Sequence, residues 1–331
     1  MGALLLARPA RADNMLAYLA HAGVGQVKLL WSRESLTPET IAALPPGERA
    51  DYEAFRSALA FGESLGLAHT SSYTRLADTG KDWLVQVVTA APANALDPVT
   101  WWFPIVGRVS YRGYFDAERA HRFAAELRTE GLDVYVRPSP LYTTLGWFED
   151  PLPRPILRWP IEDVVDTAIH EQVHLTVYIE SDVAYNESLA TFIAHRATSE
   201  FFRDQPEVAE RAQASFADEF TYARMLNELA ADLDALYASK PTPDEARARR
   251  APIFARYQGE VYAAQPWQTQ RFAGFQKLTL SNAWVVGNRD YLGLVPCFEQ
   301  ELAALGGDLP AFVRAHRQRP GHREASCGAT P

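Results

Sequence analysis

The feature that most constrains the fold is the stretch from Ile161 to Tyr178, which carries two histidines and a glutamate inside an apolar helical pattern. Its apolar positions recur at helical spacing and are predicted to face the core: Ile161, Val164, Val165, Ala168, Ile169 and Val173. Within the same stretch stands the motif His170-Glu171-Gln172-Val173-His174. Histidines four residues apart share one helix face, so both imidazoles can reach a single ion. Because unpartnered polar groups are costly to bury in an apolar helix, we expect an ion or a substrate to satisfy this face.

The H-E-x-x-H pattern also predicts a role for its glutamate. Glu171 lies too close in sequence to the two histidines to be a comfortable third metal ligand. It is well placed to take a proton from a metal-bound water. We therefore predict Glu171 as the catalytic general base of a metal-dependent hydrolase.

A third metal ligand is expected from the next helix, because a catalytic zinc takes three protein ligands and keeps one position open. Glu187 follows two candidate helix caps, Asp182 and Asn186, and is expected in or near the first turn of that helix. We predict one Zn²⁺ ion held by His170, His174 and Glu187. The alternative for Glu187 is an ordinary first-turn acid favoured by the helix dipole.

Length and charge exclude two classes of partner. The chain has 331 residues, 47% of them hydrophobic, which is enough for a large core. Its net charge of -9 and its pI near 5.4 provide no basic surface for nucleic acid. The apolar stretches fall short of the roughly 18 to 20 residues needed to cross a bilayer. We predict no nucleic-acid partner and no integral membrane segment.

Residues 1–12 have features of an export segment. They contain the short apolar run Ala3–Ala7, followed by Ala10-Arg11-Ala12, which matches an A-x-A cleavage pattern. A remnant of a signal peptide would place the protein in the periplasm or outside the cell. The alternatives are a frayed terminus and a cytoplasmic protein.

The remaining chain is predicted to form a single domain over residues 13–317, followed by a disordered tail at 318–331. A helical N-terminal layer (13–80) leads into a sheet region (81–160) and then into a helical half with the metal motif (161–317). In the sheet region, extended runs are predicted at 83–88, 106–115, 132–136 and 141–147, with a helix after Asp116. Beyond it, helices are predicted at 161–178, 186–204, 206–239, 243–264 and near 290–305.

The sequence resembles the gluzincin metallopeptidases, whose third ligand is a Glu within an N-E-x-x-A-like helix, matched here by Asn186, Glu187 and Ala190. It resembles more closely a bacterial family of predicted aminopeptidases. That resemblance runs from about Met15 through the metal motif and is carried by Val109–Asp116, Tyr142–Phe148, Asn282-Ala283 and Tyr291. It implies zinc, peptide substrates and peptide-bond hydrolysis with Glu171 as base.

The fold class expected from pattern and resemblance together is α+β. A zincin-like core would place a small mixed β-sheet over the H-E-x-x-H helix, beside a largely helical C-terminal half. Two features depart from the resemblance. The chain lacks a lipidation cysteine near its start, and it lacks the G-x-M-E-N-type element that anchors the substrate α-amine in well-known gluzincin aminopeptidases. A zinc endopeptidase of the same mechanism and a non-catalytic metal-containing binding or scaffold protein are therefore the alternatives.

The resemblance also suggests residues around the metal. Zincins hold the substrate backbone against an edge strand, so Tyr142, Thr143 and Thr144 are predicted to line the cleft; a buried strand with aromatic packing is the alternative. Tyr291 is predicted as the catalytic donor to the oxyanion, with His195 as the other candidate. Either residue could instead have only a structural role.

Overall fold

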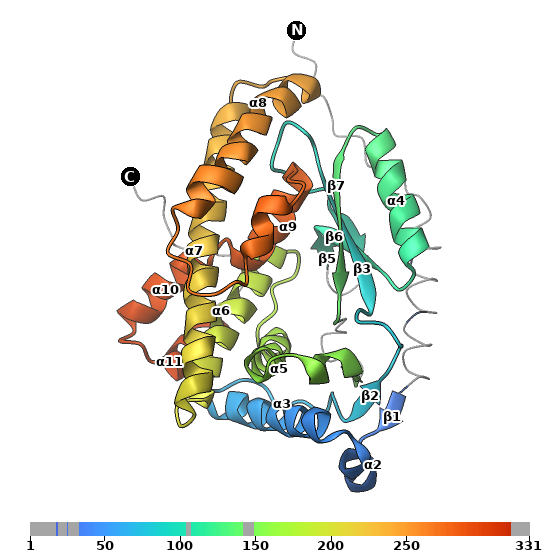
Figure 1. Cartoon of the computed structure of the whole chain (residues 1–331), viewed down its shortest axis with the longest axis vertical. Coiled ribbons are helices and arrows are strands. Elements are labelled where there is room, and N and C mark those ends of the chain that lie inside the picture. The colour runs from blue at the N-terminus through green and yellow to red at the C-terminus, as the bar shows by residue number, and fades with distance from the viewer. Residues whose placement is uncertain (1–17, 19–24, 26–32, 104–106, 142–148, 319–331) are drawn as a thin grey trace.

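A small β-sheet and a larger helical body lie side by side (Figure 1). The computed structural model describes Tyr18, Gly25 and residues 33–103, 107–141 and 149–318. The α+β class is confirmed. The strands are β1 (Arg33–Ser35), β2 (Arg75–Ala77), β3 (Val85–Ala91), β4 (Trp101–Phe103), β5 (Gly107–Val109), β6 (Tyr111–Tyr114), β7 (Asp133–Ser139) and β8 (Leu152–Pro153). The α-helices are α2 (Pro38–Ala43), α3 (Pro46–Ser64), α4 (Ala117–Thr129), α5 (Ile161–Thr176), α6 (Val183–Phe201), α7 (Pro206–Tyr237), α8 (Pro243–Arg256), α9 (Asn282–Leu292), α10 (Val295–Ala304) and α11 (Leu309–Arg317).

The sheet next to the helical body has the order β6-β3-β7, and its described pairs are antiparallel. Side chains alternate across β3, as expected for a strand. Val88 and Ala90 pack against α4 on one face, whereas Thr89 meets α9 on the other. Helix α9 comes close to the strand at Gly287, where a β-carbon would lie at van der Waals distance, 3.4 Å, from the Thr89 hydroxyl oxygen. Helix α9 therefore lies between the sheet and the other helices.

Two further strand groups are smaller. Mixed pairing occurs in the sheet β1-β2-β8, where β1 and β2 are antiparallel and β2 and β8 are parallel. Two of these three strands precede the region, 81–160, in which the mixed sheet was predicted. Strands β4 and β5 form an antiparallel pair. The N-terminal layer, predicted to be helical, thus contributes β1 and β2 as well as α2 and α3.

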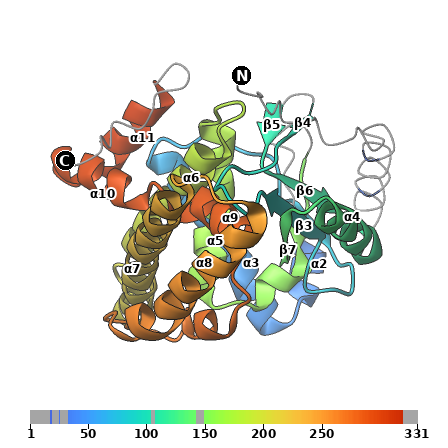
Figure 2. The same cartoon turned by 90° about the horizontal axis from the view of Figure 1, so that it is seen from above.

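Helix α6 is the centre of the helical body. It packs against α5, α7, α9, α10 and α11, and nearly every residue from Tyr185 to Thr198 is buried. Figure 2 shows α6 and α5 between the α7–α8 pair and the sheet with α4. Across the part of the chain that the structure describes, no helix combines the length and apolar character needed to cross a membrane. Helix α6 carries Glu187 through the protein interior.

Most helices predicted in the C-terminal half are found, with shifted ends. Two helices cover the region where one helix was predicted near 290–305. Helix α9 ends at Leu292, with Gly293 as its C-cap, and α10 begins at Val295, with Pro296 in its first turn. The helix predicted at 243–264 is α-helical to Arg256, has a π-helical turn over Tyr257–Val261 and ends with helical residues 262–263, close to the predicted end. Residues 1–12 and the end of the predicted tail, 319–331, lie outside the described residues.

Candidate metal centre

Helix α5 is fixed in the core by its apolar face and by Gln172. The apolar positions predicted to face the core are fully buried, apart from Ile161, which is partly buried. Gln172, inside the H-E-x-x-H motif, donates hydrogen bonds to the carbonyl oxygens of Leu59 (3.0 Å) and Ala68 (2.9 Å). These bonds join α5 to α3 and to the segment that follows α3, and they set the rotation of α5 about its axis. The motif's polar face consequently turns towards α6.

The loop between α5 and α6 is closed by Asn186. Its side chain accepts a hydrogen bond from the Ile179 N–H and donates one to the Ile179 carbonyl, both at 2.8 Å. The N-cap is Asp182, which accepts a hydrogen bond from the Tyr185 N–H at 3.1 Å. Helix α6 therefore begins at Val183, earlier than predicted, and Glu187 lies just past its first turn. The loop thus returns Glu187 to the side of the two histidines.

His170, His174 and Glu187 come together with one donor atom each. The Nε2 atoms of the two histidines are 3.1 Å apart, and Glu187 Oε2 lies 3.4 Å from His170 Nε2 and 3.6 Å from His174 Nε2. A tetrahedral ion with bonds of about 2.0–2.2 Å places its ligand atoms about 3.3–3.6 Å from one another. The three donors therefore suit one zinc-sized ion, and only the two histidine nitrogens would have to move slightly apart. Within the described residues, this is the group of His, Cys, Asp and Glu side chains whose spacing suits a metal.

The three side chains form a buried, electrostatically coupled cluster. Their exposed fractions are 17% for His170, 5% for His174 and 11% for Glu187. Burial alone would raise the pKa of Glu187, but the two histidines outweigh it and hold this pKa well below the usual range. Burial likewise opposes a charge on His174, and Glu187 raises its pKa nevertheless. The carboxylate is thus ionised and available as a ligand at neutral pH.

Glu171 is buried beside the two histidines, and one of its carboxylate oxygens has no hydrogen-bond partner in the described structure. It is 6% exposed, and the oxygen without a partner among the described residues is Oε2. Burial raises the pKa of Glu171, and the two histidines counteract part of this rise. An unpaired buried carboxylate oxygen is costly unless something donates to it. A water molecule or substrate held next to the histidines would supply that donor.

Tyr291 lies in the same environment and is held by Arg137. Arg137 Nη2 donates to the Tyr291 hydroxyl oxygen at 2.7 Å. Burial raises the pKa of Tyr291 well above its usual range; Arg137 opposes this rise, whereas Glu187 adds to it. Two other tyrosines, Tyr111 and Tyr178, also feel the Glu187 charge, and burial together with Glu187 raises the pKa of Tyr178 to about 12.

Asp290, next to Tyr291 in α9, adds a second negative charge. Its backbone carbonyl accepts a hydrogen bond from Ser188 on α6 at 3.2 Å. Its carboxylate accepts a hydrogen bond from the neutral Ser110 hydroxyl at 2.5 Å. Burial, together with the nearby Glu187, raises the pKa of Asp290 to about 6 even though the Ser110 bond acts in the opposite direction.

The two ring nitrogens of His195 pair with two other acidic side chains. Its Nδ1 lies 2.7 Å from Asp166, and its Nε2 lies 2.6 Å from Glu219. Both ring nitrogens are therefore used, so the alternative assignment of His195 as oxyanion donor does not fit this geometry. Asp166, one turn before His170, pairs with His195.

Tyr142, Thr143 and Thr144, predicted to line the substrate cleft, lie outside the described residues. Sequence reasoning did not single out Gln172, Arg137 or Asp290. The sequence did contain a signal for Arg137. It directly follows the predicted apolar strand 132–136, and a charged residue that continues such a strand into the core requires a buried partner.

The fold and the site together define an α+β protein with a two-histidine, one-glutamate cluster on adjacent helices. The chain belongs to the family described as "Putative aminopeptidase", whose model matches residues 17–325. This description indicates peptide hydrolysis. No curated protein and no solved structure shows significant similarity to the chain.

Proposed function

We propose that the protein is a zinc-dependent peptidase that acts at His170, His174, Glu187 and Glu171. The observation that supports this most is the donor spacing: three ligand atoms 3.1, 3.4 and 3.6 Å apart match a tetrahedral ion. The chemistry of the donors agrees, since two imidazoles and a carboxylate with one open position form a catalytic zinc set. Membership of the family supplies peptides as the substrate class.

In the proposed hydrolysis, Glu171 and Tyr291 have separate roles beside the metal. Zinc, when bound, acts as a Lewis acid and lowers the pKa of water from 15.7 to about 7. Glu171 accepts the proton of the attacking water and delivers it to the leaving amine. Tyr291 donates a hydrogen bond to the carbonyl oxygen as negative charge develops on it.

Aminopeptidase action requires a group that binds the free α-ammonium of the substrate, and Asp290 suits this role. Its carboxylate is partly buried, and its hydrogen-bond partner, Ser110, is neutral. Its backbone carbonyl accepts a hydrogen bond from Ser188, the residue after Glu187. A partly buried negative charge without a cationic hydrogen-bond partner favours a ligand ammonium.

The two alternative functions make different predictions. A zinc endopeptidase would use the same four residues and would not need Asp290. A non-catalytic metal-binding or scaffold protein would bind zinc but leave peptides intact. Export to the periplasm remains a prediction from residues 1–12.

The decisive experiment is digestion of a mixed peptide library by zinc-loaded wild type and by Glu171→Gln, with products identified by mass spectrometry. Glu200→Gln, an exposed acid on α6, is the matched control. We expect wild type and the control to trim free N-termini one residue at a time, and Glu171→Gln to keep its zinc and lose turnover. Internal cuts would support the endopeptidase. No cleavage by a zinc-loaded wild type would favour the scaffold.

A further inference from the structure

The contact between Arg137 and Tyr291 joins the sheet to the candidate site. Arg137 lies on β7, and Tyr291 lies in the last turn of α9. Besides the 2.7 Å hydrogen bond, the guanidinium carbon lies 4.9 Å from the Tyr291 ring centroid. Within the described residues, this is the hydrogen bond that the Arg137 side chain makes.

The direction of this bond determines where the Tyr291 proton can go. A guanidinium has five donors and no acceptor, so Arg137 can only donate to the phenolic oxygen. The phenol has a single proton, which must point away from Arg137. The positive charge behind the oxygen also makes the phenol a stronger hydrogen-bond donor.

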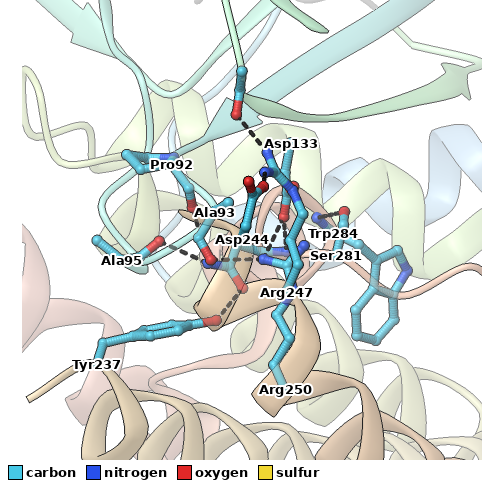
Figure 3. A network of polar contacts seen from close by, with 12 residues as sticks. Pro92, Ala93, Ala95, Asp133, Tyr237, Asp244, Arg247, Arg250, Ser281 and Trp284 are labelled. Atoms are coloured by element: carbon cyan, nitrogen blue, oxygen red, sulfur yellow. Dashed lines mark hydrogen bonds and ion pairs between the residues drawn. The ribbon is translucent and has the colours of Figure 1, made fainter. Parts of the chain in front are cut away.

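A second contact, at the other end of α9, sets the position of this helix along β7. The backbone N–H of Asn282 donates to Asp133 Oδ2 at 2.9 Å, and Arg250 holds the same carboxylate at 2.7 Å. The Asn282 side chain donates to the carbonyls of Pro92 (2.9 Å) and Ala95 (3.0 Å). It also accepts a hydrogen bond from the Tyr237 hydroxyl at 2.8 Å. Figure 3 shows this network around Asp133 and Arg250.

The distance between the Asp133–Asn282 contact and the Arg137–Tyr291 contact is nearly the same along β7 as along α9. Asp133 and Arg137 are four residues apart on β7, which corresponds to about 13 Å of strand. Asn282 and Tyr291 are nine residues apart on α9, which corresponds to about 13.5 Å of helix. Because the lengths match, anchoring Asn282 to Asp133 brings the Tyr291 hydroxyl to Arg137.

We propose that Arg137 is a positioning residue that holds the Tyr291 oxygen and leaves its proton to the substrate carbonyl oxygen. This inference rests on the proposed peptidase function. Arg137 does not itself contact the reacting atoms in this scheme; it acts through Tyr291. The role requires a cation that donates to the phenol, so Lys should replace Arg in part, and Met, which keeps an unbranched apolar stem without the cation, should not.

The test is a double-mutant comparison of Tyr291→Phe, Arg137→Met, Arg137→Lys and the double variant Arg137→Met with Tyr291→Phe. We expect kcat to fall about 10²–10³-fold in Tyr291→Phe, the loss typical for an oxyanion donor, with a similar fall in Arg137→Met. The double variant should lose no more than either single variant, because residues that act as a unit are not additive. Arg137→Lys should recover part of the activity, and KM should change little throughout.

A structural role for Arg137 predicts other results. It would lower the melting temperature and zinc content of Arg137→Met, and its loss would add to that of Tyr291→Phe. A readout independent of zinc is the ¹³Cζ NMR resonance of Tyr291, which should shift in Arg137→Met protein prepared without metal. Tyr135→Phe, two residues away on β7, is the control and should leave kcat unchanged.

The outcomes separate this inference from the proposed function. Additive losses, or an unshifted Tyr291 resonance, would overturn the role of Arg137 while leaving a zinc- and Glu171-dependent peptidase intact. A wild type that holds zinc but cleaves no peptide would overturn the function, and with it this inference. Full kcat in Arg137→Met would overturn the inference alone.

Discussion

Gly62 and Gln172 lie so close that a β-carbon on Gly62 would stand 2.0 Å from the Gln172 side-chain oxygen. Gln172 cannot move aside easily, because it is fully buried and its amide nitrogen donates to two backbone carbonyls. Helix α5, which carries the H-E-x-x-H motif, and helix α3 therefore approach each other at a position where a side chain on α3 does not fit. This contact fixes the rotation of the helix that carries both histidines.

Gly62→Ala should therefore destabilise the protein. We expect a loss of about 1–3 kcal/mol in the free energy of unfolding, as for overpacking of a core, and weaker zinc binding because α5 must shift. Denaturant unfolding and a zinc titration measure the two effects. Gly47→Ala in the same helix is the matched control, because nothing lies within 4 Å of a β-carbon there. Equal stability of the two variants would show that Gln172 moves aside without cost.

The buried His195 cluster predicts a pH dependence of stability. Burial opposes a charge on the imidazole, but Asp166 and Glu219 outweigh it and raise the pKa of His195 to about 10. Burial likewise opposes the Glu219 charge, but His195 and Arg271 lower the pKa of Glu219 to about 2. His195, with an unfolded pKa near 6.5, stabilises the fold fully below about pH 6.5 and loses this effect as pH rises through about 10. Glu219 stabilises above about pH 4.5 and loses this effect as pH falls towards 2.

His195→Gln should therefore cost most between about pH 4.5 and 6.5. We expect a loss of roughly 3 kcal/mol there, as for one partner removed from a buried ion pair, and a smaller loss at pH 10. Unfolding measured across pH tests this expectation. His69→Gln is the control, since His69 pairs with Glu63 at the surface and should cost less than about 1 kcal/mol. A pH-independent loss in His195→Gln would contradict an ionised histidine.

The sequence predicted the parts of the site that depend on local spacing. His170 and His174 share a face because they are four residues apart on one helix, and the buried positions of α5 follow from the same periodicity. Glu187 could be expected near them because a short capped loop leads from α5 to α6. These relationships span few residues, so helical geometry alone determines them.

The rest depends on contacts between distant segments. Gln172 appeared as a variable position in the motif, yet it bonds carbonyls more than a hundred residues away. Arg137 meets Tyr291 across 154 residues, and only the packing of α9 on β7 reveals this. His195 was a reasonable oxyanion candidate by helical spacing, but Glu219 on α7 already occupies its Nε2. Periodicity does not tell which helix supplies such a partner.

Asn186 should be essential for the loop that places Glu187. Asn186→Asp keeps the acceptor for the Ile179 N–H but sets a carboxylate oxygen against the Ile179 carbonyl, where Asn186 now donates. We expect a loss of about 1–3 kcal/mol in stability and a fall in zinc affinity. Isothermal titration with zinc and thermal unfolding check these effects. Asn227→Asp, which also loses one donation to a backbone carbonyl, is the control and should leave zinc affinity unchanged. Unaltered zinc affinity in Asn186→Asp would mean that α6 packing alone places Glu187.

Removing the metal should abolish activity, and the affinity for zinc should depend on pH in a defined direction. Chelation is expected to stop peptide cleavage, and one equivalent of Zn²⁺ to restore it. The ligands must be deprotonated to bind zinc, so zinc affinity should weaken as pH falls. Glu187→Gln keeps the size of the side chain but removes its charge, so it should lose zinc affinity. Glu171→Gln, which leaves the three ligands in place, should bind zinc like wild type and yet be inactive. Metal analysis of both variants after dialysis separates binding from catalysis. If Glu187→Gln retained zinc as tightly as wild type, Glu187 would be an ordinary helix acid, and the third ligand would have to be sought elsewhere.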